Sequence, residues 1–271
     1  MSTPKSNRAH LIVGGFPAGA TAGHDMDYAR IRLLNMLSNS HDVATTVSND
    51  FSDIGRWLDQ CRLLVTYVAG PYPNEEQCAH IRDWVAQGGR WLALHGTSGG
   101  KAAKISDTWH RKMVKTKHHD LLGCFFLNHP PVRKFTVNVE QHPLTEGVQN
   151  AFDVMDELYL LEIQDSAAEL LITTQLEKDP SPKGFGFVVD KDTSLQPDGK
   201  TRVLGFLRNI GDGSIIYYAL GHCHSPTTNI QPFVDSSVAE DGTTPLDFKG
   251  PWESPDFQKL LQNAIDWSLT A

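Results

Sequence analysis

Apolar and polar positions alternate along the first third of the chain in blocks that predict alternating strands and helices. Residues 11–15, 63–69 and 90–94 form short apolar runs, as strands buried on both faces do. Residues 26–37 and 74–86 lie between such runs and place apolar side chains at helical spacing. This strand–helix–strand order predicts an α/β fold with a doubly wound, mostly parallel sheet and right-handed crossovers.

Beyond residue 130 the pattern is less regular and predicts three further strands, an added β-hairpin and a C-terminal helix. These elements fall at 132–139, 158–163, 170–175, 202–207 with 214–220, and 257–268. We find no internal repeat and therefore predict a single domain over residues 1–271.

Two polar stretches rich in proline, 177–200 and 225–255, do not have the pattern of core segments. The second begins soon after His222 and carries Trp252, an aromatic side chain able to cover a ligand. A long loop inside a compact domain is usually a functional lid or is disordered. Both interpretations of 225–255 stay open from the sequence, with a lid insertion as the candidate of interest.

The composition narrows the class of partner. The 271 residues carry a formal net charge of -8, and 40% of them are hydrophobic. Such a charge argues against nucleic acid or an anionic membrane as the main partner. No apolar run could span a bilayer, and the polar first residues do not resemble a secretory leader. The four cysteines lack zinc or disulfide spacing, so a reducing cytoplasm is the expected location.

Histidines recur at the ends of apolar runs. His95 and His222 each follow a predicted strand, His129 closes the run 125–128, and His24 lies beyond the first strand. In open α/β sheets, ligands bind at the carboxyl ends of the strands. Imidazole is also the side chain best suited to proton transfer or metal ligation near neutral pH. These positions predict an active site, and each histidine alone is equally compatible with a structural role.

The segment 96–100, Gly-Thr-Ser-Gly-Gly, matches the pattern of a serine-hydrolase elbow. In that interpretation Ser98 is the nucleophile, His222 or His224 the base and Asp156 the orienting acid. However, an elbow places its serine tight against the strand, and Ser98 lies several residues past Leu94. Short glycine-rich loops also match this pattern by chance.

Other polar clusters carry weaker signals. Asp156 and Glu157 are adjacent carboxylates entering an apolar run, so strand alternation lets at most one face a site. A carboxylate held against apolar walls becomes a usable acid or base, whereas the alternative is a solvated turn. The histidines at 118–119 lie in a basic stretch that predicts a solvated helix face. His142 is best interpreted as a turn residue.

Several motifs together resemble the trehalose-utilisation (ThuA-like) family. In family order they are 88–95, 119–130, 142–147, 156–159 and 213–222. The resemblance runs from the first strand to the final Asp266-Trp267. Two features depart from the family, a longer loop at 225–255 and the glycine-rich segment 96–100, and both lie beside the predicted site.

The resemblance implies a flavodoxin-like, class I glutamine-amidotransferase-like fold without amidotransferase activity, because His95 stands where the nucleophilic cysteine would be. It also implies sugar metabolism: family members act with sugar oxidoreductases on 3-keto derivatives of disaccharides or glycosides, by isomerisation or a related step. His95, His129, Glu157 and His222 fall on the family's motif positions, and His24 matches more loosely.

The favoured hypothesis is thus an acid–base enzyme, isomerase-like or lyase-like, acting on a keto-sugar. Glu157 would be the acid/base, His95 and His222 would polarise the carbonyl or shuttle the proton, and Tyr159 would donate a hydroxyl proton. Alternatively, His95, His129 and His222 would hold a divalent ion such as Zn, Mn or Mg. The predicted substrate contacts are His24, Ser98, Asp156 and Trp252.

Two other functions stay open: a serine hydrolase or esterase, and a non-catalytic sugar-binding or regulatory module. A nucleotide cofactor is not expected. The expected partners are a small sugar and a sugar oxidoreductase of the same pathway, and self-association into a homo-oligomer is left open.

Overall fold

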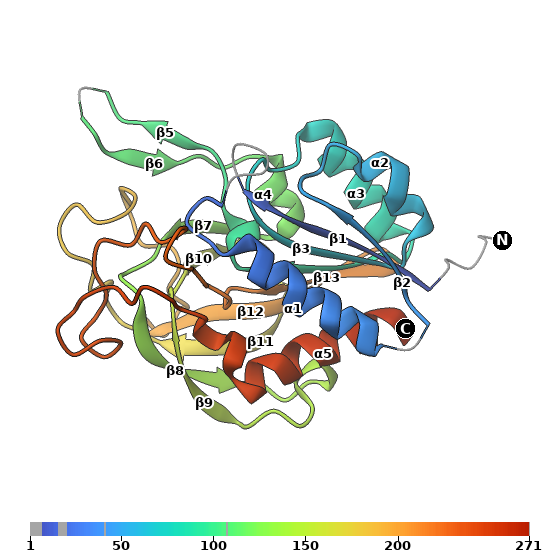
Figure 1. Ribbon diagram of the computed structural model, residues 1–271. Helices are drawn as coiled ribbons and strands as arrows, with labels where there is room; N and C mark the ends of the chain where they lie inside the picture. Colours follow the sequence, from blue (N-terminus) through green and yellow to red (C-terminus); the bar gives the residue numbers. More distant parts are fainter. Residues whose placement is uncertain (1–6, 16–20, 41, 107, 271) are drawn as a thin grey trace.

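The structure, a computed structural model, describes residues 7–15, 21–40, 42–106 and 108–270. Its centre is one nine-stranded sheet (Figure 1) with the order β2-β1-β3-β4-β13-β12-β11-β8-β9. The strands are β1 (Arg8–Gly15), β2 (Ala44–Ser48), β3 (Leu63–Ala69), β4 (Arg90–Leu94), β8 (Arg133–Val139), β9 (Ala151–Asp156), β11 (Glu169–Gln175), β12 (Thr201–Ile210) and β13 (Gly213–Tyr218).

The α/β class is confirmed, with a sheet that is mixed rather than mostly parallel. The strands from β2 to β13 along the sheet pair in parallel. From β13 to β9 every neighbouring pair is antiparallel. The predicted hairpin, β12–β13, is the place where the direction reverses. Because β8 and β9 mostly alternate more exposed and less exposed residues, this edge of the sheet has one face in water.

Helices cover both faces of the parallel half of the sheet (Figure 1). On one face α1 (Met26–Asn39) packs beside α5 (Pro255–Thr270), and on the other α3 (Glu75–Ala86) packs with α2 (Ile54–Trp57) and α4 (Lys117–Leu122). The predicted start of α3 is confirmed, because the Asn74 side chain accepts a hydrogen bond from the Gln77 amide in a capping box. None of the helices in the described part of the chain is long and apolar enough to cross a membrane.

Smaller elements complete the fold. Strand β7 (Cys124–Asn128) pairs with β10 (Leu160–Ile163), and β5 (Ala102–Lys104) pairs with β6 (Arg111–Met113) as a separate hairpin. The short helices are η1 (Leu58–Gln60), η2 (His95–Ser98), η3 (Pro143–Thr145) and η4 (Gly250–Glu253).

The prediction of a solvated helix face around residues 118–119 is wrong. His118 and His119 are both buried. The His118 Nε2 atom lies 2.6 Å from the carbonyl oxygen of Thr97, and the His119 Nε2 atom lies 3.1 Å from that of Gly99. Their rings therefore bind the turn that follows β4, which is why they leave the solvent.

Residues 225–249 follow an irregular path across the carboxyl end of the sheet and contain no helix or strand beyond a bridge between His224 and Phe248. Val234 and Phe248 pack with Val132 in a small second apolar cluster. The segment is thus packed onto the body of the protein rather than standing free of it.

Candidate functional site

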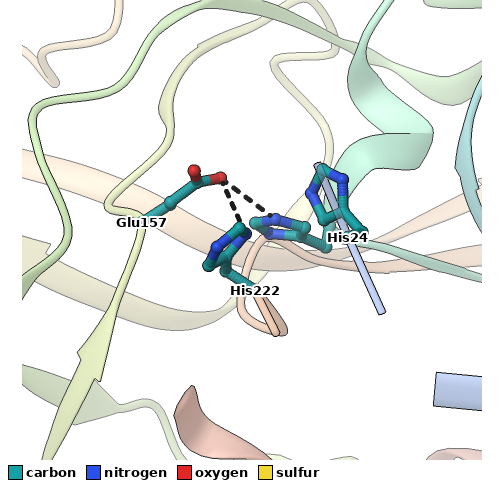
Figure 2. A group of neighbouring side chains, drawn as sticks. His24, Glu157 and His222 are labelled. Carbon is teal, nitrogen blue, oxygen red and sulfur yellow. Dashed lines mark ion pairs between the residues drawn. The ribbon is translucent and has the colours of Figure 1, made fainter. Parts of the chain in front are cut away.

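Three histidines and one glutamate meet at the carboxyl ends of the parallel strands. His24 precedes α1, His95 follows β4, Glu157 follows β9, and His222 follows β13. One potential ligand atom from each of these residues lies within 4.8 Å of those from the other three, and all four residues are buried. Figure 2 shows the His222 ring beside the Glu157 carboxylate and His24 on the other side of the same group. Residues from four separate parts of the chain therefore form one compact polar cluster.

The backbone conformation at the ends of β4 and β13 orients the rings of His95 and His222. His95 has a φ of 43°, a left-handed conformation that costs a non-glycine residue about 1–3 kcal/mol and is concentrated at functional sites. Gly221 has a φ of 132°, which only glycine adopts readily, and it turns the chain so that His222 enters the cluster. Trp252 and Tyr67 both donate hydrogen bonds to the Gly221 carbonyl, at 2.7 and 2.8 Å.

Trp252 and Asp156, which the sequence analysis predicts as substrate contacts, hold the backbone turn that carries His222. Trp252 is fully buried against the Gly221 turn. Asp156 is also fully buried and accepts hydrogen bonds from the backbone amides of Gly221, His222 and Glu157, at 2.7, 2.9 and 2.9 Å. Burial raises the pKa of Asp156 to about 7, against the opposing effects of His95 and the Gly221 amide. This carboxyl ties the end of β9 to the turn after β13.

Hydrogen bonds assign the ring protons of His24 and His95. The Nδ1 atom of His24 lies 2.9 Å from the carbonyl oxygen of Ala22, and that of His95 lies 2.7 Å from the carbonyl oxygen of Ala219. A carbonyl oxygen only accepts, so each Nδ1 carries the proton. In the neutral ring the Nε2 atom then presents a lone pair, and both Nε2 atoms belong to the cluster.

A chain of two hydrogen bonds through His224 shows which ring nitrogen of His222 carries the proton. The His224 Nε2 atom lies 2.8 Å from the carbonyl oxygen of Pro245 and therefore donates to it. The His224 Nδ1 atom is then an acceptor, 3.0 Å from the Nε2 atom of His222. His222 donates through Nε2, so its Nδ1 atom presents a lone pair to the cluster.

Glu157 lies at the centre of these lone pairs. Its Oε2 atom is 3.3 Å from the Nε2 atom of His95 and 3.4 Å from the Nδ1 atom of His222. Its Oε1 atom accepts a hydrogen bond from the amide of Gln231, in the segment 225–249. Burial opposes ionisation of Glu157, but positive charge on the rings of His129 and His222 and an N–H donated by His95 outweigh it and hold the pKa of Glu157 well below its usual range.

The charge states of the histidines follow from the same surroundings. Burial, together with the neighbouring His95, lowers the pKa of His24 to about 4. Burial also holds the pKa of His222 well below its usual range. Burial acts in the same direction on His95, but Glu157 and Asp156 outweigh it and raise the pKa of His95. At neutral pH His24 and His222 are therefore neutral rings with free lone pairs, next to one carboxylate.

His129 lies at the open side of the cluster. Its Nε2 atom is 3.6 Å from the Oε1 atom of Glu157, and its side chain is 17% exposed, against 4% or less for Glu157, His95 and His222. The predicted metal set named His129, whereas the compact group contains His24 in that place.

Tyr159 stacks on His95 and on His129, with centroid distances of 4.3 and 5.8 Å. Burial and the Glu157 charge raise the pKa of Tyr159 well above its usual value, so its hydroxyl stays protonated.

Two half-buried phenylalanines stand beyond His129: Phe185, which the sequence interpretation did not assign to the site, and Phe233, from the segment 225–255 that it proposed as a lid. The Phe185 ring lies 5.7 Å from that of His129, edge to face, and 5.5 Å from the Phe233 ring. Gly184 and Gly186 have φ values of 84° and 68°, so Phe185 is carried on a sharp turn. A side chain at Gly186 would collide with the Asn128 amide, 2.0 Å from its first carbon. In the sequence, the Gly-Phe-Gly pattern at 184–186 was the feature that could have indicated a turn presenting Phe185.

Ser98 does not have the surroundings of a nucleophile. It is fully buried, its hydroxyl donates to the backbone carbonyl of His95, and it accepts a hydrogen bond from the Tyr217 hydroxyl. Among the described residues no hydrogen bond joins Ser98 to His222 or His224. Ser98 therefore shapes the turn after β4, and neither the serine-hydrolase role nor the substrate contact predicted for it fits this geometry.

Comparison with known proteins adds a family and a fold. The family model described as "Trehalose utilisation" (ThuA) matches residues 16–235. A ThuA-like protein from Bacteroides uniformis is similar in structure, with a TM-score of 0.59 and 16% sequence identity, over 99% of this chain and 94% of that chain. For a ThuA-like protein from Parabacteroides merdae the TM-score is 0.57 at 17% identity, over 98% and 91% of the two chains.

The fold also occurs within a larger enzyme. The β-galactosidase from Rahnella sp. R3 aligns with 79% of this chain over 28% of its own length, with a TM-score of 0.50 and 13% identity. At such identities the structural likeness shows the fold alone. No protein of curated function matches the sequence.

Proposed function

This chain belongs to the trehalose-utilisation (ThuA) family, and we propose that it is a metal-dependent enzyme acting on a keto-sugar by acid–base chemistry. The family places the chain in carbohydrate metabolism, which supports a sugar as the substrate class. The His24–His95–Glu157–His222 cluster supports the metal and the type of chemistry.

The observation that carries the proposal is the set of unused lone pairs. Within the described residues, His24 Nε2, His95 Nε2 and His222 Nδ1 are buried and have no hydrogen-bond partner. Buried polar atoms are rarely left unpaired, and lone pairs facing a carboxylate repel it unless a cation or a proton lies between them. The opposite nitrogen of each ring is bound to a fixed acceptor, as in the outer shell of protein metal sites.

The donor set also indicates which ion fits. Three imidazole nitrogens and one carboxylate oxygen are ligands that zinc or manganese accepts, whereas magnesium prefers an oxygen shell. Such an ion, when bound, supplies a Lewis acid that polarises a sugar carbonyl or hydroxyl. Glu157, predicted from the sequence as the acid/base, is better placed as a ligand, because its Oε2 atom lies 3.3 and 3.4 Å from the two ring nitrogens that would share the ion, and Gln231 holds its Oε1 atom.

With Glu157 as a ligand, His129 is the residue placed to act as the general base. Its Nδ1 atom lies 2.8 Å from the carbonyl oxygen of Pro130 and carries the proton, so Nε2 presents its lone pair beside Glu157 at the open side. A proton next to a ketone is removed more easily when the developing charge is stabilised, and a positioned base typically contributes about 10²–10⁴-fold. Tyr159 holds the His129 ring against His95 by stacking.

The experiment that tests the function compares metal-loaded and chelated protein on a panel of 3-keto glycosides and free keto-sugars. We expect about one equivalent of zinc or manganese per chain and isomer formation that falls at least about 10²-fold after chelation. Readdition of the ion should restore it. Sugar binding without any product would instead favour the non-catalytic module, and protein that retains no ion would contradict the metal.

Phe185 and Phe233 provide the next prediction, because the two rings line the open side beside His129. Apolar ring faces of a sugar pack well on aromatic side chains, and such contacts bind ground and transition states alike. We expect Phe185→Ala to raise KM about tenfold with little change in kcat. Steady-state kinetics of this variant check the split, and Ile31→Ala, which removes an exposed apolar side chain on α1, serves as the control. A fall in kcat alone would contradict a binding role.

A further inference from the structure

A basic arm projects from the body of the protein. It consists of residues 101–106 and 108–117, which include strands β5 and β6, and it stands away from the central sheet in Figure 1. In the sequence, residues 101–117 carry six lysines and arginines against one acidic residue, Asp107, in a chain with a net charge of -8. Trp109, near its tip, is 71% exposed. Positive charge and a large apolar side chain are thus concentrated on one protruding hairpin.

Part of this charge is unused within the chain. Lys112 pairs with Asp190 and Lys115 with Glu162. No ion pair within the described part of the molecule involves Lys101, Lys104 or Arg111, which are all exposed. The arm is held to the body by a hydrogen bond from the Val188 amide to the Arg111 carbonyl, yet Trp109 stays exposed beside unpaired charges, and such a surface favours an interaction.

A complementary surface lies on the same side of the molecule. The acidic loop, residues 225–249, carries four acidic side chains against one lysine. Glu240, Asp241 and Asp247 are exposed on it. The same loop carries Ile230 and Leu246, which are 74% and 72% exposed. Each surface therefore combines exposed apolar side chains with charge, and the two charges are opposite in sign.

We propose that the basic arm of one copy of this chain docks on the acidic loop of a second copy, and reciprocally, in a two-fold dimer. Within one copy the arm and the loop lie apart, with the segment 177–200 between them on the left side of Figure 1. Because both surfaces face the same side, a two-fold axis between two copies brings each arm onto the partner's loop. Such an interface is self-complementary, as closed dimers require, and opposite charges steer its formation.

The docking surface reaches the candidate site. Ile230 packs over Gly23, next to His24, with its terminal carbon 2.7 Å from the place of an added Cβ. The adjacent Gln231 binds the Glu157 carboxylate. An arm seated on Ile230 and Leu246 restricts the same loop that holds Glu157. Formation of the dimer is thus coupled to the order of the site, although the interface itself does not depend on the proposed reaction.

Sedimentation velocity of the full chain, over about a hundredfold range of protein concentration, tests the dimer. We expect a dimer that weakens with salt. The double variant Lys104→Glu/Arg111→Glu should raise its dissociation constant more than about tenfold, as should Glu240→Lys/Asp241→Lys. An equimolar mixture of these two variants should associate again, because both contacts of the mixed dimer then join opposite charges.

The control is Arg56→Glu/Lys259→Glu, which reverses two exposed charges outside both surfaces and should leave the dimer intact. Circular dichroism verifies that every variant is folded, and Trp109→Ala gives a second, uncharged test of the arm. A wild-type chain that stays monomeric throughout would overturn the proposal. A dimer indifferent to the arm and loop variants would overturn it equally.

Discussion

Replacing Glu157 with glutamine is expected to abolish binding of the divalent ion and to lower turnover at least about 10³-fold, while the protein stays folded. The carboxylate is the single anionic group among the four clustered side chains. Its loss removes the charge that balances the cation, and with the cation the stabilisation of the developing negative charge on the substrate. Metal content of the purified variant and its initial rates on the keto-sugar give the two readouts.

The stability of the same variant distinguishes a metal site from a structural ion pair. In the metal-free wild type, a buried carboxylate faces two ring nitrogens, at 3.3 and 3.4 Å. Glutamine at position 157 places a neutral N–H donor there, which can satisfy one of these lone pairs. We therefore expect Glu157→Gln to melt at or above the temperature of the chelated wild type, yet to gain no stability from added zinc.

Glu162→Gln is the matched control, because this glutamate pairs with Lys115 on the surface away from the cluster. It should keep full metal content and activity. Zinc bound by Glu157→Gln with unchanged affinity would refute the ligand assignment. A large loss of stability in the metal-free variant would instead mean that the Glu157–His95 pair mainly holds the fold together.

The strands that carry His95 and His222 could be predicted because they are buried on both faces. Strand β4 begins and ends at the predicted residues, and β13 (Gly213–Tyr218) overlaps most of the predicted range 214–220, since continuous apolar runs between turn signals have few alternative structures. Once these strands are parallel neighbours, the residues that follow them share an edge of the sheet. The convergence of His95 and His222 thus follows from local sequence together with one topological rule.

Other parts of the site depend on contacts that a sequence pattern does not contain. Strand β9 was missed because its exposed and buried residues alternate only weakly in polarity, and its half of the sheet is antiparallel. Gln231 and Phe185 reach the cluster from irregular segments whose paths are set by packing against distant residues. His24 was assigned only loosely, because a loop before a helix places its side chain by tertiary contacts.

The tautomer of each histidine ring is a further property that depends on tertiary contacts and could not be predicted from the sequence. A histidine in a sequence has two equivalent tautomers, and the partner of one nitrogen determines which lone pair remains. For His222 that partner is His224, two residues along the chain, and the partner of His224 is the carbonyl of Pro245. The relay therefore runs from the acidic loop into the cluster, and it makes His224 a positioning residue.

Replacing His224 with leucine is accordingly expected to weaken binding of the divalent ion about 10–100-fold, the range typical of outer-shell partners of metal ligands. Leucine removes the acceptor 3.0 Å from His222 Nε2. Without it, the His222 proton is free to move to Nδ1, the atom that faces Glu157, and this tautomer cannot bind a cation. Competition titration with a chelator of known affinity measures the change, and His224→Asn tests its cause.

Asparagine places a side-chain oxygen close to the position of the Nδ1 atom and can still accept the proton of His222, although it lacks the contact with Pro245. If tautomer control is the role of His224, the asparagine variant should recover most of the lost affinity and leucine none of it. If the ring acts only by packing against Phe248, with a centroid distance of 5.5 Å, both variants should lose affinity alike, since neither retains an aromatic ring. The ratio of the two dissociation constants therefore separates hydrogen-bond control of the ligand from simple packing at the same position.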